Sequence, residues 1–274
     1  MFTESCRYLG KCIIIVDDGK QIVRHNFALV GRRLGHSYSQ RWFEQLFLRL
    51  GLTDYTYSLH EMESLDGLRR WVEDGAIGGF NVTVPYKQAV IPMLDRLSSE
   101  AEAIGAVNCV VVDADGRLYG HNTDAPAFGE TLTAVADTGF DCAVVLGTGG
   151  AARAVGYALG RMGIPHVFAS RQPDRHPDLV AIDYAAADRR LRQARCPLLV
   201  NATPVGMFPD VDATPWSGAI DKRYTVYDLV YNPAPTRLLQ QAIDCGATTV
   251  DGLAMLYRQA ELSWQLFSGS NSSW

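Results

Sequence analysis

Several polar side chains in this sequence stand where strand-like segments end, and they could bind and protonate a small polar molecule. They occur in three segments, Gly35–Ser39 (GHSYS), Asn81–Lys87 (NVTVPYK) and Gly120–Asp124 (GHNTD). Side chains alternate along a strand, so Asn81 and Thr83 share one face, and Lys87 emerges just past Pro85. A lysine ammonium in a pocket can donate a proton and stabilise negative charge that develops on an oxygen. The plain alternative for Lys87 is a lysine at the start of a surface helix.

A glycine-rich segment provides a second candidate site. Gly147, Thr148, Gly149, Gly150, Ala151 and Ala152 fit the pattern G-x-G-x-x-G/A. Glycines allow a tight turn and a close approach of the backbone to a pyrophosphate, and the N-terminus of the following helix attracts its charge. The apolar run 142–146 before the turn and the helical pattern 151–162 after it are the context that the motif requires. We therefore predict a dinucleotide site here; an ordinary glycine-rich turn is the alternative.

The charge that follows the next strand indicates which dinucleotide binds. An NAD site usually places an acidic residue roughly 20 residues after the glycine turn, where it binds the ribose hydroxyls. This chain has Arg171 and Arg175 in that region, and Asp174 lies a few residues late for the NAD role. A guanidinium suits a 2′-phosphate by its charge and its forked donors, so the predicted cofactor is NADP. Two solvated surface arginines are the alternative.

Strand-like and helix-like segments alternate along the chain, which predicts an α/β fold with a parallel sheet covered on both faces. The expected strands are 27–30, 55–59, 80–84, 142–146, 166–169, 198–201, 226–229 and 248–250, with a hairpin over 106–112 and 117–119. The expected helices include one ending at Gly51, one that Ser64 could cap and Gly75 follows, and those at 151–162, 236–245 and 253–267.

Composition and charge exclude several classes of function. The 274 residues are 47% apolar, which is enough for one or two buried cores. The net charge is −5 with no basic stripe, which argues against nucleic-acid binding. No apolar run reaches the roughly 18 residues that cross a bilayer, and the run 12–16 is too short for a signal peptide. The six cysteines include no C-x-x-C pair, so we expect a reducing cytoplasm and no structural metal.

With these motifs in order, the chain resembles the shikimate dehydrogenase family over roughly residues 26–268. The motifs that carry the resemblance are Asn81–Lys87, Ala106–Asn108, Asn122–Asp124, the glycine turn, Asn201–Pro204, Tyr227–Asp228 and Asp251–Leu256. The resemblance implies two α/β domains flanking a cleft, the second a Rossmann-type doubly wound parallel sheet. It implies a substrate-binding domain of 25–123 plus 252–274 and an NADP-binding domain of 124–251. The reaction would be the reversible NADPH-dependent reduction of 3-dehydroshikimate to shikimate, in aromatic amino acid (chorismate) biosynthesis.

The resemblance also assigns roles to individual residues. Lys87 matches the catalytic lysine and Asp124 its partner, and Ser37 and Ser39 match the hydroxyls that hold the substrate carboxylate. Further substrate contacts match Thr83, Asn108, Asp124, Tyr231 and Gln259. The cofactor surroundings match Gly147, Thr148, Gly149, Gly150, Ala151, Ser170, Arg171, Gln172, Arg175, Leu229 and Gly252. His36 and His121 are left out of the catalytic set.

The chemistry fits these assignments but leaves one role open. Hydride transfer to a ketone leaves negative charge on the oxygen, which Lys87 can neutralise with a proton. A carboxylate favours the ammonium form of a lysine, so Asp124 is expected to position Lys87 and the substrate hydroxyls. That Lys87 mainly binds and orients the substrate stays an alternative.

The sequence departs from the family pattern in three places. Gly31-Arg32-Arg33 and Gln40 replace residues around the serine pair that commonly include proline, so this loop is expected to have a different shape. Ser170 and Gln172 replace the usual Asn and Thr beside the cofactor arginine. Residues 1–24 have no family counterpart; an added strand, a flexible tail and a start-site artefact all stay open.

Two other functions and the assembly state also stay open. A quinate/shikimate dehydrogenase of broader specificity is the nearest alternative, and Arg171 argues against its use of NAD. A non-catalytic NADP-sensing regulator is the alternative from another class, and the presence of Lys87 and Asp124 argues against it. The expected partners are small molecules, with the chain as a monomer or homodimer.

Overall fold

The computed structural model describes residues 15–17, 20–22, 25–35, 37–135 and 139–269, and it divides into two compact units. The first unit takes its described residues from 1–102, 107–123 and 260–274, and the second from 103–106 and 124–259. The division falls inside the last helix, α9 (Leu253–Phe267), rather than before it. Which unit binds substrate and which binds cofactor stays a prediction.

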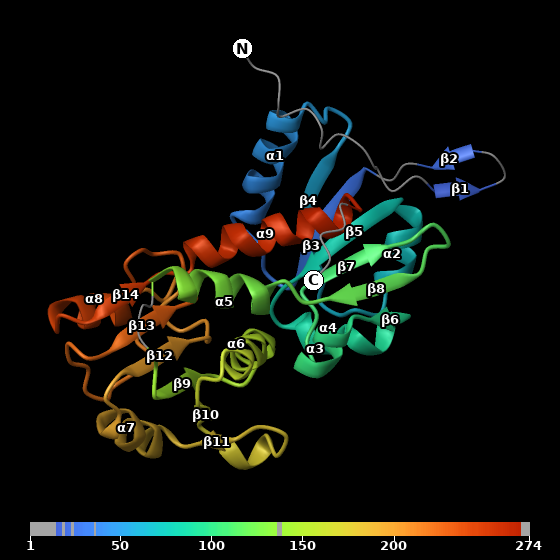
Figure 1. The fold of residues 1–274 in the computed structure, drawn as a ribbon. Coiled ribbons are helices and arrows are strands. Elements are labelled where there is room, and N and C mark those ends of the chain that lie inside the picture. Colours follow the sequence, from blue (N-terminus) through green and yellow to red (C-terminus); the bar gives the residue numbers. More distant parts are fainter. Residues whose placement is uncertain (1–14, 18–19, 23–24, 36, 136–138, 270–274) are drawn as a thin grey trace. The chain divides into compact units, whose positions relative to one another are not determined.

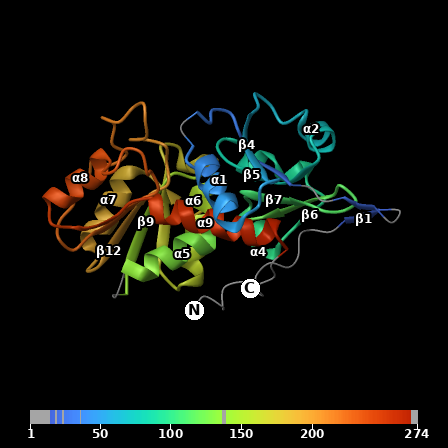
Figure 2. The same cartoon turned by 90° about the horizontal axis from the view of Figure 1, so that it is seen from above.

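The first unit is built on a six-stranded mixed sheet. In sheet order its strands are β4 (Thr56–Glu61), β3 (Asn26–Gly31), β5 (Ile77–Val82), β7 (Cys109–Val112), β8 (Leu118–His121) and β6 (Arg96–Leu97). Strands β4, β3 and β5 are parallel, and β7 lies antiparallel between β5 and β8, beside β5 in Figure 2. The carboxyl ends of β3, β5 and β8 and the amino end of β7 therefore share one edge of the sheet.

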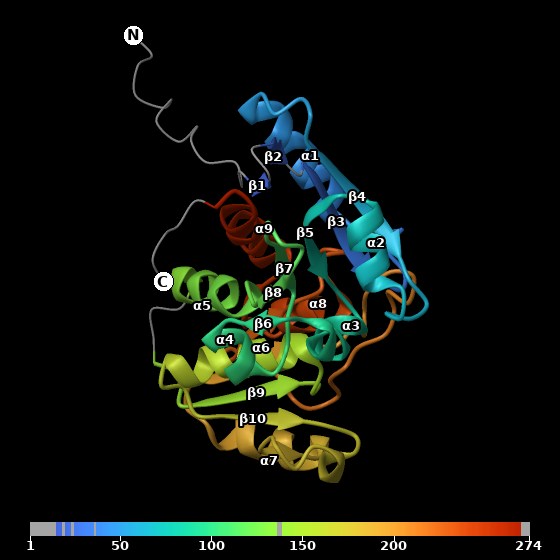
Figure 3. The ribbon, with the colours of Figure 1, turned by 90° about the vertical axis from the view of Figure 1, so that its right-hand side faces the viewer.

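Helices cover both faces of this first sheet, because apolar side chains point alternately to each face of β3. Phe27 and Leu29 pack with α1 (Ser39–Leu50) and the end of α9, while Ala28 and Val30 face the cluster that includes α2 (Leu68–Asp74). Figure 3 shows α9 and α2 on opposite sides of the strands. The remaining helical segments are α3 (Tyr86–Ala89), η1 (Ile91–Met93) and α4 (Ser99–Ile104).

The second unit is a fully parallel six-stranded sheet. In sheet order its strands are β11 (Ala181–Ile182), β10 (His166–Ala169), β9 (Cys142–Leu146), β12 (Pro197–Asn201), β13 (Thr225–Asp228) and β14 (Thr248–Val250). Its helices are α5 (Asp124–Val135), α6 (Gly150–Arg161), η2 (Pro173–Arg175), α7 (Tyr184–Gln193) and α8 (Arg237–Asp244). Figure 1 labels the strands, and Figure 3 shows α6 and α7 on opposite sides of β9 and β10.

This arrangement confirms the predicted doubly wound α/β fold. The chain begins in the middle of the sheet at β9, runs outward to β11, and then returns to β12 and runs the other way. Ligands of such sheets bind beyond the carboxyl ends of the strands at this reversal, which lies between β9 and β12. The glycine segment 147–150 follows β9, at the predicted location.

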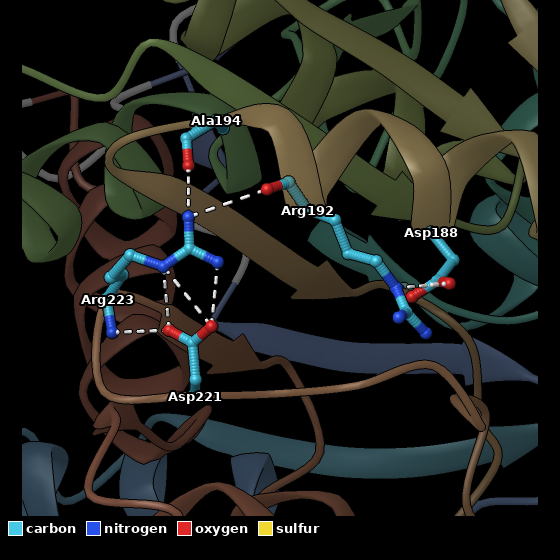
Figure 4. A network of polar contacts seen from close by, with 5 residues as sticks. All are labelled: Asp188, Arg192, Ala194, Asp221 and Arg223. Atoms are coloured by element: carbon cyan, nitrogen blue, oxygen red, sulfur yellow. Dashed lines mark hydrogen bonds and ion pairs between the residues drawn. The ribbon is translucent and has the colours of Figure 1, made fainter.

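Ion pairs brace the opposite, amino-terminal edge of the second sheet (Figure 4). Arg223, just before β13, forms a bidentate pair with Asp221 and donates to the Ala194 carbonyl at 2.7 Å. Along α7, Arg192 pairs with Asp188 at 2.8 Å. The cation of Arg223 therefore satisfies a carbonyl group at the end of α7, which suits the negative end of the helix dipole.

Most predicted elements are confirmed, with small shifts at their ends. Strands 142–146, 166–169 and 248–250 and helix 253–267 have the predicted bounds. The strand predicted over 80–84 already ends at Val82, because the chain turns at Thr83 before the proline. Ser64 is not a helix cap: α2 begins after Gly67, and the Ser64 hydroxyl bonds within its own turn to Asp66. Within the unassigned segment 1–24, the described residues form two antiparallel paired strands, β1 (Ile15–Asp17) and β2 (Lys20–Ile22).

The packing of α9 generates a stability prediction. Phe267 is 1% exposed, and its ring centroid lies 4.9 Å from that of Phe27. Phe267→Ala should lower the free energy of unfolding by about 3–5 kcal/mol, because it leaves a cavity in a packed cluster. Urea unfolding followed by tryptophan emission measures this loss. Leu48→Ala, at a side chain on α1 that is 82% exposed, is the control, and equal losses in the two variants would contradict the packing described.

Candidate active site

Two loops, one after β3 and one after β5, meet at the edge of the first sheet where the carboxyl ends of β3, β5 and β8 lie. A Cβ atom at Gly31 would lie 2.6 Å from Thr83 Cγ2, so the glycine is what allows this close approach. The Arg32 N–H donates to the Val84 carbonyl at 3.4 Å. The segment that leads to the serine pair therefore lies beside the segment that leads to Lys87.

The serine pair lies where this first loop enters α1. The Ser37 N–H donates to the Leu34 carbonyl at 2.8 Å, and the Ser39 N–H donates to Ser37 Oγ at 3.3 Å. Leu34 is itself tied to β4, because its N–H donates to Glu61 Oε1 at 2.6 Å. Ser37 is half-buried, and Ser39 is buried as the first residue of the helix. These bonds shape the loop without the prolines of the family pattern; His36 lies outside the described residues.

Thr83 and Lys87 are held by the turn that follows β5. The Thr83 N–H continues the sheet by donating to the Val30 carbonyl at 2.9 Å, and the Tyr86 N–H closes the turn on the Thr83 carbonyl at 2.9 Å. Lys87 is half-buried in α3, and its carbonyl accepts the N–H of Val107 at 2.7 Å. The backbone of Lys87 is thus fastened to the segment that begins β7.

A buried hydrogen-bond network joins the neighbouring segments. Asn108 Nδ2 donates to Thr123 Oγ1 at 2.9 Å, and Asn108 Oδ1 accepts the Thr123 N–H at 2.7 Å. Asn81 Nδ2 donates to Ser263 Oγ at 2.8 Å, and Asn81 Oδ1 accepts the Tyr57 hydroxyl at 2.9 Å. The hydroxyls of Thr123 and Ser263 lie 3.2 Å apart.

This network gives Asn108 a structural role beside its predicted contact with substrate. The roles of Tyr57 and Ser263 could not be predicted from the sequence, because each lies in an element whose apolar pattern already explains it and its partners are distant in sequence. Burial raises the pKa of Tyr57 well above its usual value, so this hydroxyl stays protonated and acts as a donor.

The other predicted substrate residues belong to the second unit. Asp124 is buried as the first residue of α5, where the helix dipole favours a negative charge. Tyr231 is half-buried in the loop after β13. Gln259 lies on α9 and donates through Nε2 to the Leu256 carbonyl at 2.9 Å. Because Lys87 lies in the first unit and Asp124 in the second, their partnership stays a prediction.

The glycine turn has the geometry that a pyrophosphate site requires. Gly147 has φ +104°, a conformation that side chains disfavour, and a Cβ there would lie 3.0 Å from Thr203 Cγ2. Gly149 is exposed, and a Cβ on it would meet no atom within 4 Å. Helix α6 begins at Gly150, directly after this open position, and the N–H groups of its first turn have no partner within the helix. The turn therefore fits a dinucleotide at the positive end of a helix.

The predicted 2′-phosphate segment follows β10. Ser170 is buried and its hydroxyl accepts the Gln172 N–H at 3.1 Å, which turns the chain outward. Arg171, Gln172 and Arg175 are at the surface, with Arg175 ending η2. Neither guanidinium forms an ion pair with another described residue, so both charges face solvent. The pair fits an anionic group at this edge of the sheet.

A second buried network positions the loops after β12 and β13. Asp228 accepts hydrogen bonds from Asn201 Nδ2 at 2.8 Å, the Val230 N–H at 3.0 Å and the Thr236 hydroxyl at 2.7 Å. Burial nevertheless dominates and raises the pKa of Asp228 to about 6, against the lowering effect of these bonds. The Leu229 N–H donates to the Asn201 carbonyl at 2.9 Å.

Gly252 and Leu229, both predicted near the cofactor, are in close contact. A Cβ at Gly252 would lie 2.0 Å from the Leu229 carbonyl oxygen, so no other residue fits there without movement of the backbone. The chain after β14 therefore crosses directly over the end of β13. The two residues were predicted from the resemblance, and the close approach supplies a physical reason for the glycine.

Metal-binding groups, disulfide bonds and membrane-spanning helices can be assessed for the residues that the structure describes. Its His, Cys, Asp and Glu side chains form no group of three or more that could hold a metal ion. The described cysteines, Cys109, Cys142, Cys196 and Cys245, form no disulfide bond, while Cys6 and Cys12 lie outside the described residues. None of the described helices is both long and apolar enough to cross a membrane.

Comparison with known proteins gives one consistent result. Residues 29–110 match the family model described as the shikimate dehydrogenase substrate binding domain. A shikimate dehydrogenase (NADP(+)) of Methanopyrus kandleri is 39% identical over 267 residues, covering 89% of this chain and 90% of that protein. A second, from Chlorobium chlorochromatii, is 37% identical, covering 89% of this chain and 91% of that protein.

Solved structures agree with the sequence relatives. Shikimate 5-dehydrogenase of Thermus thermophilus, in complex with NADP(H) and shikimate, is 37% identical with a TM-score of 0.78, covering 89% of this chain and 93% of that chain. Quinate dehydrogenase of Corynebacterium glutamicum, in complex with NAD, is 32% identical with a TM-score of 0.79 and the same coverage.

The buried Asp228 generates a prediction about pH. Its pKa of about 6 in the folded chain exceeds the value near ~3.9 of an unfolded aspartate, so folding takes up a proton between these values. The resulting stability is complete below about pH 4 and is lost as the pH rises through about 6. Asp228→Asn stays neutral and should not show this loss. Between pH 4 and 6.5 the wild type should lose roughly 1–3 kcal/mol of unfolding free energy relative to the variant.

Urea midpoints measured for both proteins over this pH range test the point. The other titrating groups are common to both chains, so the difference between the two profiles isolates residue 228. Parallel profiles would contradict the raised pKa.

Proposed function

We propose that this chain, which belongs to the shikimate dehydrogenase family, catalyses the reversible NADPH-dependent reduction of 3-dehydroshikimate to shikimate. It is thus an NADP-dependent oxidoreductase that acts on a CH–OH group. The observation that carries the proposal is that Ser37, Ser39, Thr83 and Lys87 lie on two adjoining loops at one edge of the first sheet. Asn108 holds the segment beside them.

Lys87 is the proposed proton donor. When bound, NADPH supplies the electron pair that reduces the substrate ketone. The Lys87 ammonium gives a proton to the ketone oxygen, and in the reverse direction the amine takes the proton from the hydroxyl. Before transfer, the same cation stabilises charge on this oxygen. Asp124 is the proposed positioning partner of Lys87 and of the substrate hydroxyls.

Substrate orientation is proposed to rest on neutral donors and amides. The hydroxyls of Ser37 and Ser39 donate to the substrate carboxylate, and they sit at the start of α1, where the helix dipole also favours an anion. Thr83, Asn108, Tyr231 and Gln259 are the further proposed contacts. Several fixed donors of this kind hold a ring in one orientation toward the acid.

The residues proposed to hold NADP follow the strands of the second sheet. The turn from Gly147 to Ala151 takes the pyrophosphate, as its open Gly149 and the start of α6 support. Arg171 and Arg175 take the 2′-phosphate beside Ser170 and Gln172, and Leu229 and Gly252 are the further proposed contacts with the cofactor. The chain is further proposed to work in the cytoplasm as a monomer or homodimer.

Quinate oxidation is the second candidate function, since a quinate dehydrogenase is among the structural neighbours. That protein was solved with NAD, whereas this chain has surface arginines where an NAD site has an acid. Absorbance at the nicotinamide band with shikimate or quinate, and with NADP or NAD, compares the four reactions. Faster turnover of quinate with NAD would favour the second function, and no turnover of either substrate would favour an NADP-sensing regulator.

Replacement of Lys87 tests the chemistry. Lys87→Ala should lower kcat by roughly 10²–10⁴-fold and change the KM for shikimate far less, because the proton is needed in the transition state. Stopped-flow or steady-state absorbance gives both constants. Gln88→Ala, at the exposed neighbour in α3, is the matched control. A raised KM with a nearly normal kcat would assign Lys87 to binding and orientation instead.

Replacement of Arg171 tests the choice of cofactor. Arg171→Ala should raise the KM for NADPH roughly 10- to 100-fold, because a charge-assisted bond to the phosphate is lost. The KM for NADH, which carries no 2′-phosphate, should change little. Arg189→Ala, on the exposed face of α7, removes the same charge away from the site. Equal effects on the two cofactors would remove Arg171 from the phosphate site.

A further inference from the structure

The segment that carries the two cofactor arginines has little regular structure of its own. It connects the parallel strands β10 and β11 over residues 170–180, and its only helical part is the three-residue η2. Parallel strands are usually connected through an α-helix, which would hold the start of such a segment by packing. Here most of the segment is exposed, so other contacts must fix its position.

Two side-chain contacts join this segment to the glycine turn and its helix. Thr148 Oγ1, inside the turn, lies 2.9 Å from Nε2 of His176, the residue directly after Arg175. Arg153, in the first turns of α6, forms an ion pair with Asp178 at 2.6 Å. The two contacts use different residues on both sides.

The ion pair is anchored mainly on the helix side. The Arg153 side chain is 15% exposed and that of Asp178 is 56% exposed, so a nearly fixed guanidinium receives a carboxylate from a more exposed segment. The hydrogen bond from Arg153 lowers the pKa of Asp178, so the carboxylate is charged at neutral pH. The pair therefore limits where residues 171–178 can go.

We propose that Arg153, Asp178 and His176 are positioning residues that hold the arginine-bearing segment against the glycine turn and thereby set the preference for a 2′-phosphate. The proposal rests on the proposed use of NADP. Arg171 and Arg175 contact the phosphate, and the three positioning residues act through them. A pre-ordered segment loses less conformational entropy when the phosphate binds, which strengthens binding.

Electrostatics alone makes the opposite prediction for Asp178. A carboxylate near the site repels a phosphate, so its neutralisation should tighten binding of a 2′-phosphorylated ligand. A positioning role predicts weaker binding, because the segment is released from Arg153. The sign of the change in affinity therefore separates the two explanations.

The experiment measures binding of adenosine 2′,5′-bisphosphate and of 5′-AMP by titration calorimetry, with no substrate and no turnover. Asp178→Asn should weaken binding of the bisphosphate roughly 3- to 30-fold and change that of 5′-AMP by less than about twofold. Asp178→Glu, which keeps the charge, should restore most of the affinity. Asp174→Asn, in the η2 turn of the same segment, is the matched control and should leave binding unchanged or tighter.

His176→Ala provides a second variant that leaves the ion pair in place. It should also weaken binding of the bisphosphate selectively, since it removes the contact with Thr148. The proposal would be overturned if both variants bound the bisphosphate as tightly as the wild type or more tightly. It would also be overturned if the affinities for the bisphosphate and for 5′-AMP fell equally. If the wild type itself binds the two ligands equally, the proposed use of NADP fails, which is a distinct result from failure of the positioning role.

Discussion

Buried polar groups need hydrogen-bond partners, and in the first unit this constraint determines where the candidate site can form. Asn81, Asn108, Thr123 and Ser263 are all buried and satisfy one another across segments that are up to 182 positions apart. A shift of any one segment would leave a buried amide or hydroxyl unpaired, at a cost of about 1–3 kcal/mol. This network also helps to fix the loop with Lys87, because the Lys87 carbonyl accepts the N–H of Val107, next to Asn108 in the chain.

In the second unit, close backbone contacts and a buried aspartate fix the loops at the edge of the sheet. Asp228 receives three donors and so ties the loops after β12 and β13 to the start of α8. Gly147 and Gly252 let backbone segments approach where a side chain would not fit. In both units, hydrogen bonds and close contacts fix the backbone next to exposed polar residues at one edge of the sheet, and groups that are fixed in this way can act without reorganisation.

How much of this could be predicted from the sequence depends on the range of the interactions involved. Strand β9, the glycine turn and α6 follow from local patterns, since periodicity and glycine spacing are read within one segment. The position of Lys87 just past a strand end marks it as a candidate acid, whereas its assignment as the catalytic lysine and the role of Ser37 come from the family resemblance. Ser263 and Tyr57 were missed, as were His176 and Asp178, because each matters through a partner that only the folded chain brings near. Ser64 shows the converse. Its residue type favours a helix cap, but its hydroxyl instead donates to Asp66 within the turn before the helix.

The final helix has a consequence for the order of folding during synthesis. Its residues Ala260 and Phe267 complete the apolar cluster around Phe27 and Phe43, which lie more than 200 positions earlier in the chain. The second unit is nearly continuous in sequence, from 124 to 259, and can gather its own core before those residues emerge. The strands and helix around Phe27 are therefore translated long before the residues of α9 that cover them, and their apolar face stays uncovered in the interval. Chaperones that shield nascent chains act on surfaces of this kind.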